Sequence, residues 1–204
     1  LPVTLGANVP KMNNADMQST GFELDLGWRD RIKDFDYGVH LLLSDDRQKI
    51  LKYPNTTGKI NTWYVGKYNG DIWGFETIGI AKSQEEMDAH LASLPNGGQD
   101  ALGVKWGAGD IMYRDLNGDG KISDGATLND PGDKKVIGNT SPRFRFGLDL
   151  NASWKGIDVR LFFQGVAKRD AWLNDNMFWG ATGGIWQSAC FTSHLDFFRE
   201  EGDD

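Results

Sequence analysis

Four segments of this sequence alternate apolar and polar side chains, and this alternation constrains the fold more than any other feature. They span 21–29, 35–43, 143–155 and 157–165. In 143–155, for example, the apolar set runs from Phe144 to Trp154 and the polar set from Arg143 to Lys155. Because successive side chains of a strand point to opposite faces, the pattern predicts an all-β fold of strands with one apolar and one polar face.

Two architectures satisfy this pattern. In a soluble sandwich the apolar face meets a core and the polar face meets water. In a transmembrane β-barrel the apolar face meets lipid and the polar face lines the interior. The segments are nine to thirteen residues long, which suits tilted membrane strands. Aromatic residues lie near their ends, as in an aromatic girdle. These features favour antiparallel strands of a partial barrel, localised in the outer membrane.

Unequal connections predict the orientation of these strands. The turns at 30–34 and 155–156 are short, whereas 44–142 is long, and outer-membrane barrels have short periplasmic turns and long extracellular loops. We therefore expect barrel hairpins at 21–43 and 143–165. The segments 1–20, 44–142 and 166–204 are expected to be extracellular.

The 44–142 insertion is expected to have structure of its own. Short strands are predicted at 62–66 and 71–77, where aromatic residues are broken by glycine. Ser83 and Glu86 form a capping box, and Pro95 with Asn96 and two glycines would end a helix. The sequence thus predicts one short helix near 84–93.

Composition excludes several function classes. The net charge is −7 and the isoelectric point is near 5.0, which argues against a nucleic-acid partner. The single cysteine, Cys190, excludes an internal disulfide, and the three histidines share no metal-ligand spacing. No common catalytic motif appears, and no pair of carboxylates is selected for hydrolysis. The chain is not expected to be an enzyme.

One motif carries metal chemistry. Oxygen-bearing side chains at the first, third and fifth positions, followed by glycine, match the first half of an EF-hand calcium loop. The backbone carbonyl at the seventh position and a carboxylate at the tenth could complete the set, while Ala126 occupies the twelfth position. The candidate ligands are Asp115, Asn117, Asp119, Lys121 and Asp124. The alternative is a turn held by side-chain hydrogen bonds, without calcium.

Aromatic and basic residues suggest further sites. Trp63, Trp73 and Trp106 in the insertion could stack on sugar rings of a substrate, or could pack a local core instead. Arg143 and Arg145 are expected on the same polar face, where they could line a lumen or simply be solvated.

Several motifs together resemble the SusC/RagA family of TonB-linked outer-membrane transporters. Two runs resemble the family's extracellular-loop signatures, 109–122 (GDIMYRDLNGDGKI) and 136–150 (VIGNTSPRFRFGLDL). Shorter similar pieces lie at 13–17, 21–23, 72–77, 154–156, 162–165 and 168–170.

The resemblance implies the function of a nutrient importer. Members of this family have a plug domain inside a 22-stranded barrel and import oligosaccharides or peptides using TonB. A SusD-like surface lipoprotein covers the barrel. Since about eight strands is the minimum for a closed membrane barrel, four would make this chain a fragment of the later part of the barrel. The alternative is a secreted β-sandwich that binds calcium and glycan.

Overall fold

The computed structural model describes residues 13–173 and 191–196, which form mostly antiparallel β-sheet with one short α-helix. They divide into two compact units. The first comprises 13–69 and 142–168, and the second comprises 70–141, 169–173 and 191–196. Much of the expected loops at 1–20 and 166–204 lies outside the described residues. Among the helices described, none is both long and apolar enough to cross a membrane.

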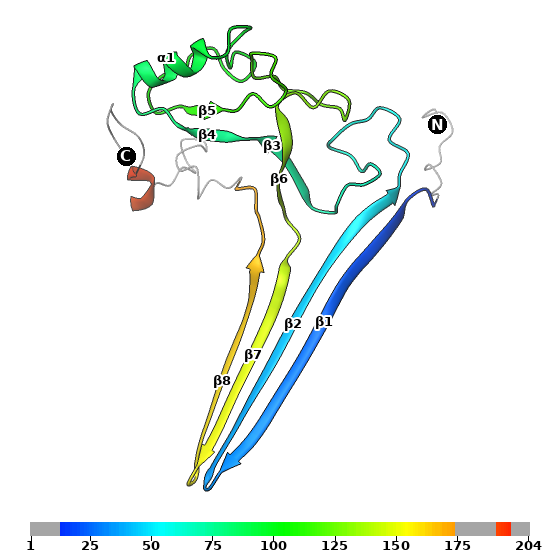
Figure 1. Cartoon of the computed structure of the whole chain (residues 1–204), viewed down its shortest axis with the longest axis vertical. Helices are drawn as coiled ribbons and strands as arrows, with labels where there is room; N and C mark the ends of the chain where they lie inside the picture. Colours follow the sequence, from blue (N-terminus) through cyan, green and yellow to red (C-terminus); the bar gives the residue numbers. More distant parts are fainter. Residues whose placement is uncertain (1–12, 174–190, 197–204) are drawn as a thin grey trace, which may run out of the picture. The chain divides into compact units, whose positions relative to one another are not determined.

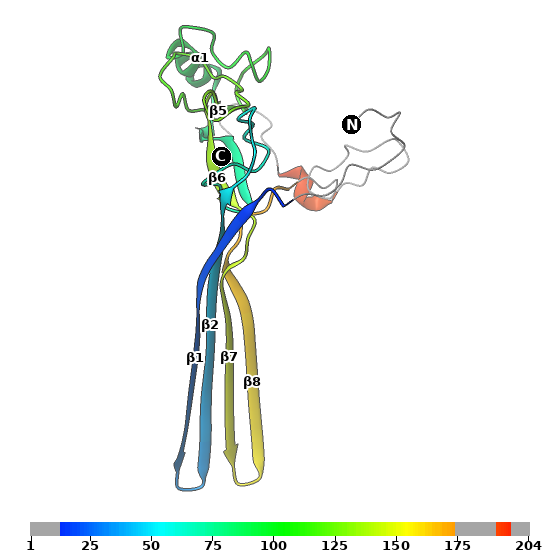
Figure 2. The same ribbon diagram turned by 90° about the vertical axis from the view of Figure 1, so that its right-hand side faces the viewer.

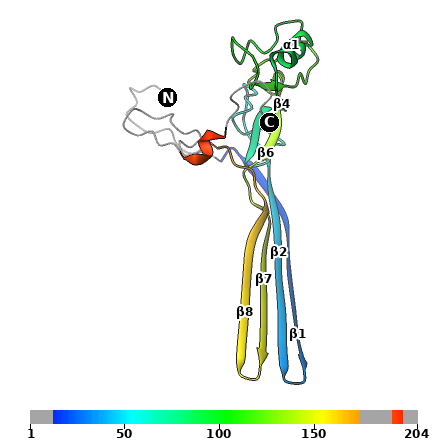
Figure 3. The ribbon, with the colours of Figure 1, turned by 90° about the vertical axis from the view of Figure 1, so that its left-hand side faces the viewer.

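The first unit is a four-stranded antiparallel sheet with the strand order β1-β2-β7-β8. Its strands are β1 (Asp16–Ile32), β2 (Phe35–Lys52), β7 (Arg143–Trp154) and β8 (Ile157–Lys168). They lie side by side with both hairpin turns at one end (Figures 1, 2 and 3). Within the described residues the sheet stays open at β1 and β8, which is consistent with part of a barrel rather than a closed one.

Both strands of the first hairpin are longer than the alternation predicts. β1 begins at Asp16, and β2 continues to Lys52, with which Asp16 pairs. They therefore run into segments 1–20 and 44–142, which we expected to be loops. Residues 44–49 are all polar, and such a run carries no signal of period two. Backbone pairing nevertheless extends the ladder through them.

The turn between β7 and β8 follows from its residues. Lys155 and Gly156 have φ values of 47° and 85°. A two-residue type I′ turn needs positive φ at both positions, and its twist matches that of the flanking strands. Glycine adopts this conformation without the steric cost of a Cβ atom.

The register places all the apolar faces on the same side of the sheet. Five successive levels of paired residues run along the strands, beginning with Leu24–Leu43–Phe146 and ending with Ile32–Phe35–Trp154–Ile157. The third level is Trp28–Val39–Leu150–Leu161. Trp28 is 63% exposed and Leu161 is 50% exposed. The fourth level, Asp30–Tyr37–Ala152–Val159, includes one carboxylate, near the hairpin turn. An otherwise apolar surface of this extent is typical of contact with lipid or with another protein.

The segment 62–66, predicted as a strand, is not one. It consists of turns and irregular backbone within the connection that follows β2. Gly66, with φ of 95°, donates its N–H to the carbonyl of Ile50. The buried Lys67 ammonium donates to the carbonyl of Ile60 at 2.8 Å. Side-chain capping of carbonyls thus replaces the ladder of a strand here.

The second unit contains two small ribbons and the helix. β3 (Asp71–Phe75) pairs with β6 (Lys134–Asn139), and β4 (Thr77–Ile80) pairs with β5 (Ile111–Tyr113). Ala81, Met87 and Met112 form a buried cluster on which Leu91 and Trp106 pack. A 3₁₀ turn, η2, covers Thr192–Leu195.

The helix α1 (Gln84–Ala92) lies where the capping box predicts it. The Ser83 hydroxyl accepts a hydrogen bond from the N–H of Glu86 at 3.2 Å. The Glu86 carboxylate accepts one from the N–H of Lys82 at 2.8 Å. These bonds satisfy donors that a helix N-terminus leaves without partners.

The buried side chain of Gln99 forms hydrogen bonds with the backbone of β5, as a neighbouring strand would. The Gln99 carbonyl oxygen accepts the N–H of Tyr113 at 2.7 Å, and its amide donates to the carbonyl of Ile111 at 3.1 Å. Gln99 is fully buried, and His90 lies 3.0 Å from its carbonyl oxygen. The amide therefore satisfies backbone groups that burial would otherwise leave unpaired.

Candidate functional site

The polar face of the sheet carries ionisable groups from all four strands. His40 on β2 lies with Nε2 2.6 Å from an Asp25 oxygen on β1. Asp149 on β7 pairs opposite His40 in the register and accepts the Nε–H of Arg160 on β8 at 2.9 Å. Asp25, His40, Asp149 and Arg160 therefore form a row of ionisable side chains across the sheet. We call it the polar ladder.

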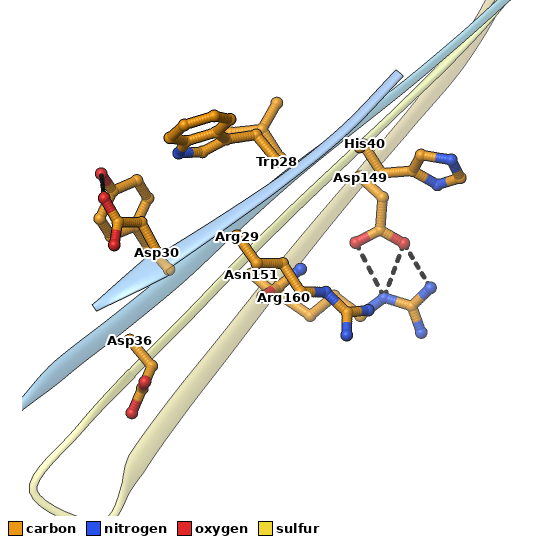
Figure 4. A pocket seen from close by; sticks show the side chains of 11 residues that line it. Trp28, Arg29, Asp30, Asp36, His40, Asp149, Asn151 and Arg160 are labelled. Atoms are coloured by element: carbon orange, nitrogen blue, oxygen red, sulfur yellow. Dashed lines mark hydrogen bonds and ion pairs between the residues drawn. The ribbon is translucent and has the colours of Figure 1, made fainter. Parts of the chain in front are cut away.

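A hollow of about 1050 Å³ adjoins this ladder. Gly27, which carries no side chain, lines it together with the polar residues Arg29 and Asn151. Asn151 leans over Gly38, and its Oδ1 lies 2.7 Å from where a Cβ atom would stand. In Figure 4 the side chains of Arg29 and Arg160 both extend to the side on which Asp149 lies. The hollow is polar and open to solutes in water.

A second hollow of about 430 Å³ lies farther along the same face. Leu42 and Phe162 flank Gly147, whose missing side chain leaves room for both. Phe162 is 58% exposed. Glu23, Arg145 and Gln164 supply polar groups around this apolar floor. An apolar floor with a few polar groups is the usual composition of a small-molecule site.

Two ion pairs lie at the end of the sheet away from the turns. Arg143 binds both oxygens of Asp45, and Arg145 binds Asp46. Since Asp45 and Asp46 are adjacent in β2, they point to opposite faces. The expectation that Arg143 and Arg145 share a face is therefore wrong. Phe144 between them has φ of 54°, outside the β region, and this breaks the alternation.

The Asp/Asn/Gly motif folds into a tight acidic loop. Asp115 accepts the N–H groups of Gly118 at 2.6 Å and Gly120 at 2.8 Å. Asn117 accepts the N–H of Asp119, and Asp119 accepts that of Lys121. Burial raises the pKa of Asp115, but these and neighbouring backbone donors outweigh it and hold that pKa below its ordinary value.

One carboxylate of this loop lies outside the predicted motif. Asp133 is fully buried, and its oxygens accept the N–H groups of Leu116 and Ser123, both at 2.7 Å. Asp115, Asp119 and Asp133 each place an oxygen within 4.8 Å of the others. No spacing rule marks Asp133, because the chain returns to the loop only through the turn at Pro131 and Gly132.

The other two candidate ligands differ in their relation to this cluster. The Asp124 carboxylate is not among the three clustered carboxylates and is ion-paired with the Lys134 ammonium. Lys121 contacts the cluster, because its backbone N–H donates to Asp119 at 3.1 Å, and it forms an isolated bridge with Gly98.

The three candidate tryptophans have different local surroundings. Trp63 belongs to the first unit, is 38% exposed, and makes an edge contact with Tyr53 at 5.7 Å between ring centroids. Trp73 is half-buried in β3. Trp106 packs on the buried cluster and donates its indole N–H to the carbonyl of Gly103. Trp106 therefore has the local-core role that was the alternative to sugar stacking.

Comparison with known proteins adds evidence of ancestry. No family model matches the chain. TonB-dependent receptor P26 of Formosa agariphila is 30% identical over 178 residues, which cover 81% of this chain. TonB-dependent receptor P3 of the same organism is 23% identical over 178 residues, or 80% of this chain. These matches support the TonB-dependent receptor family. The chain spans only 16% of the length of each relative.

Similarity to the TonB-dependent receptors agrees with the two-faced sheet. Both relatives match the chain over about four fifths of its length. An open sheet with one apolar and one charged face is what a section of such a receptor's barrel wall requires.

Proposed function

We propose that this chain is a section of a TonB-dependent outer-membrane transporter and has no enzymatic activity. The observation that carries the proposal is the five matched apolar levels of the sheet. From Leu24 to Ile32 the strand rises ~27 Å at ~3.3 Å per residue. At a tilt of 35–45° this gives a height of roughly 20 Å, close to the ~25 Å apolar band of outer-membrane barrels.

The proposal includes an orientation. The turns at 33–34 and 155–156 would face the periplasm because outer-membrane barrels have short turns there. The connection between β2 and β7 contains the whole 70–141 part of the second unit, and it would face the outside. The polar ladder would line the water-filled interior.

The transported solute is proposed to be an oligosaccharide, or a peptide, as in the SusC/RagA family. Supporting this, the hollow at Leu42, Gly147 and Phe162 combines an apolar floor with polar groups, which suits the apolar face and hydroxyl edge of a sugar ring. Trp63 and Trp73 are the aromatic residues proposed to contact such a solute in the outer loops. A SusD-like lipoprotein is the proposed partner, and TonB would act through parts of the receptor beyond this section.

Cysteine labelling of the full-length receptor in native outer membranes tests the wall. In a Cys190→Ser background, Leu150→Cys and Asn151→Cys place single thiols on adjacent residues of opposite faces. A water-soluble maleimide should label the second and not the first, and a lipid-soluble one should label the first. Equal labelling by the aqueous reagent, or recovery of the protein from the soluble fraction, contradicts the proposal and favours a secreted sandwich.

Calcium binding at the acidic loop is a separate proposal. It is supported by the convergence of Asp115, Asp119 and Asp133 and by the match to half of an EF-hand loop. Calorimetric titration of calcium tests it, with Asp119→Asn as the variant and Asp124→Asn as the matched control outside the cluster. Loss of a saturable heat only in Asp119→Asn supports calcium binding, and identical heats in both variants and the wild type refute it.

A further inference from the structure

Among the described residues, four arginines of the sheet form ion pairs with carboxylates, whereas Arg29 on the polar face does not. The pairs are Arg31–Asp36, Arg143–Asp45, Arg145–Asp46 and Arg160–Asp149. Arg47 instead lies over the ring of Tyr68. Within the described part of the chain, Arg29 makes no hydrogen bond or ion pair with any carboxylate. Its charge acts only at longer range on Asp149.

Arg29 lines the first hollow and lies on the same level of the register as Arg160. The register joins Arg29 to Gly38, Gly38 to Asn151, and Asn151 to Arg160. The two arginines thus start from the outer strands, with backbones ~14 Å apart across three strand spacings. Only a glycine and an asparagine lie between them. In Figure 4 both side chains are directed to the side of Asp149, and the charge of Arg29 acts on that carboxylate.

Most charged groups around this hollow already have partners. Arg160 occupies both oxygens of Asp149, and two nitrogens of the Arg31 guanidinium hold Asp36 at 2.7 Å. Asp30 also lines the hollow, but it accepts the N–H of Arg31 and the O–H of Tyr37 and follows Arg29 on β1, so the two side chains start from opposite faces. Arg29 is therefore left without a carboxylate partner among the described residues, on the same level of the register as Asn151.

We propose that Arg29 and Asn151 form a subsite for an oxyanion group of the transported solute, namely a carboxylate, sulfate or phosphate. The inference rests on the proposed function, in which this face meets the interior. The planar guanidinium offers two parallel N–H donors, which match two oxygens of an oxyanion. The Asn151 amide can donate a further hydrogen bond. Arg160, already engaged, strengthens the attraction through its charge.

Inorganic sulfate is the probe that tests the subsite without knowledge of the solute. Thermal unfolding of the full-length receptor in detergent micelles is followed as sulfate replaces chloride at constant ionic strength. Wild type and Arg31→Gln, the matched control two residues along β1, should show the same saturable rise in Tm. Arg29→Gln should lose that rise. An equal rise in all three proteins would mean an adventitious ion only and would overturn the subsite, as would no saturable rise in the wild type.

The same variants distinguish a solute's oxyanion from a carboxylate of another segment of the receptor. If Arg29 is open to solute, Arg29→Gln leaves Tm in sulfate-free buffer close to that of wild type. If an internal carboxylate already holds Arg29, the variant lowers Tm in that buffer and wild type does not respond to sulfate, which refutes the inference. The proposed barrel wall is tested independently by the cysteine labelling, so the two failures remain distinguishable.

Discussion

A lysine placed at mid-depth on the apolar face gives the sharpest test of the two-faced sheet. Leu150 belongs to the third of five apolar levels, with Val39 and Leu161 as its paired neighbours. If that level lies at the middle of a bilayer, Leu150→Lys should cost ~2–4 kcal/mol of folding free energy. Since 1.4 kcal/mol corresponds to tenfold, the ratio of folded to unfolded protein should fall roughly 30- to 700-fold.

Two matched variants define the controls. Ile157→Lys lies on the same face at the last level, near the interface, where the cost should be only ~0–1 kcal/mol. Ser153→Lys lies on the opposite face, where its register neighbours are Asp36 and Asp158, and should change stability by less than ~0.5 kcal/mol. The assay is denaturant unfolding of the full-length receptor reconstituted in phospholipid vesicles. Equal costs at Leu150 and Ser153, or a cost that does not depend on depth, would refute the reasoning.

Three other predictions concern single interactions. Asp45→Asn breaks a buried ion pair and should lower the free energy of unfolding by ~3–5 kcal/mol in denaturant unfolding. Its control Asp46→Asn breaks an exposed pair and should lower it by under ~1 kcal/mol. Similar costs for the two variants would contradict the argument from burial. Gln99→Ala leaves backbone groups of β5 unpaired and should lower the free energy of unfolding by ~1–3 kcal/mol. Hydrogen exchange at the backbone N–H of Tyr113 should become faster. Unchanged exchange would show that the Gln99 side chain does not pair with β5 as a strand would. The lowered pKa of Asp115 stabilises the acidic loop above the ordinary aspartate pKa, and this contribution should disappear as pH falls through the lower folded value. Amide exchange measured from pH 6 to 2 should show this loss in wild type and not in Asp115→Asn.

Local chemistry made several elements predictable. The alternation of apolar and polar residues predicted strands at all four segments, because a strand with one apolar face repeats every two residues. The capping box located α1, because Ser83 and Glu86 satisfy donors within a single turn. Lys155 and Gly156 located the second hairpin turn. Where polarity occurs on both faces, as in residues 44–49, the pattern disappeared although pairing continued.

The candidate site depended on contacts between distant segments. Asp133 joins Asp115 and Asp119 only because the chain folds back through a turn. The predicted ligand Asp124 instead pairs with Lys134. Phe144 reverses the faces of Arg143 and Arg145 through one positive φ value. None of these placements has a fixed spacing that a sequence pattern could reveal.

The sequence by itself determined that this protein has strands with one apolar and one polar face, because side-chain periodicity is a property of each strand alone. Only the tertiary structure decided which polar residues meet. Asp25, His40, Asp149 and Arg160 come from four strands, and their contacts depend on strand order and register. Arg29 became a candidate subsite for the same physical reason, since whether a charge is neutralised depends on neighbours that pairing brings across the sheet.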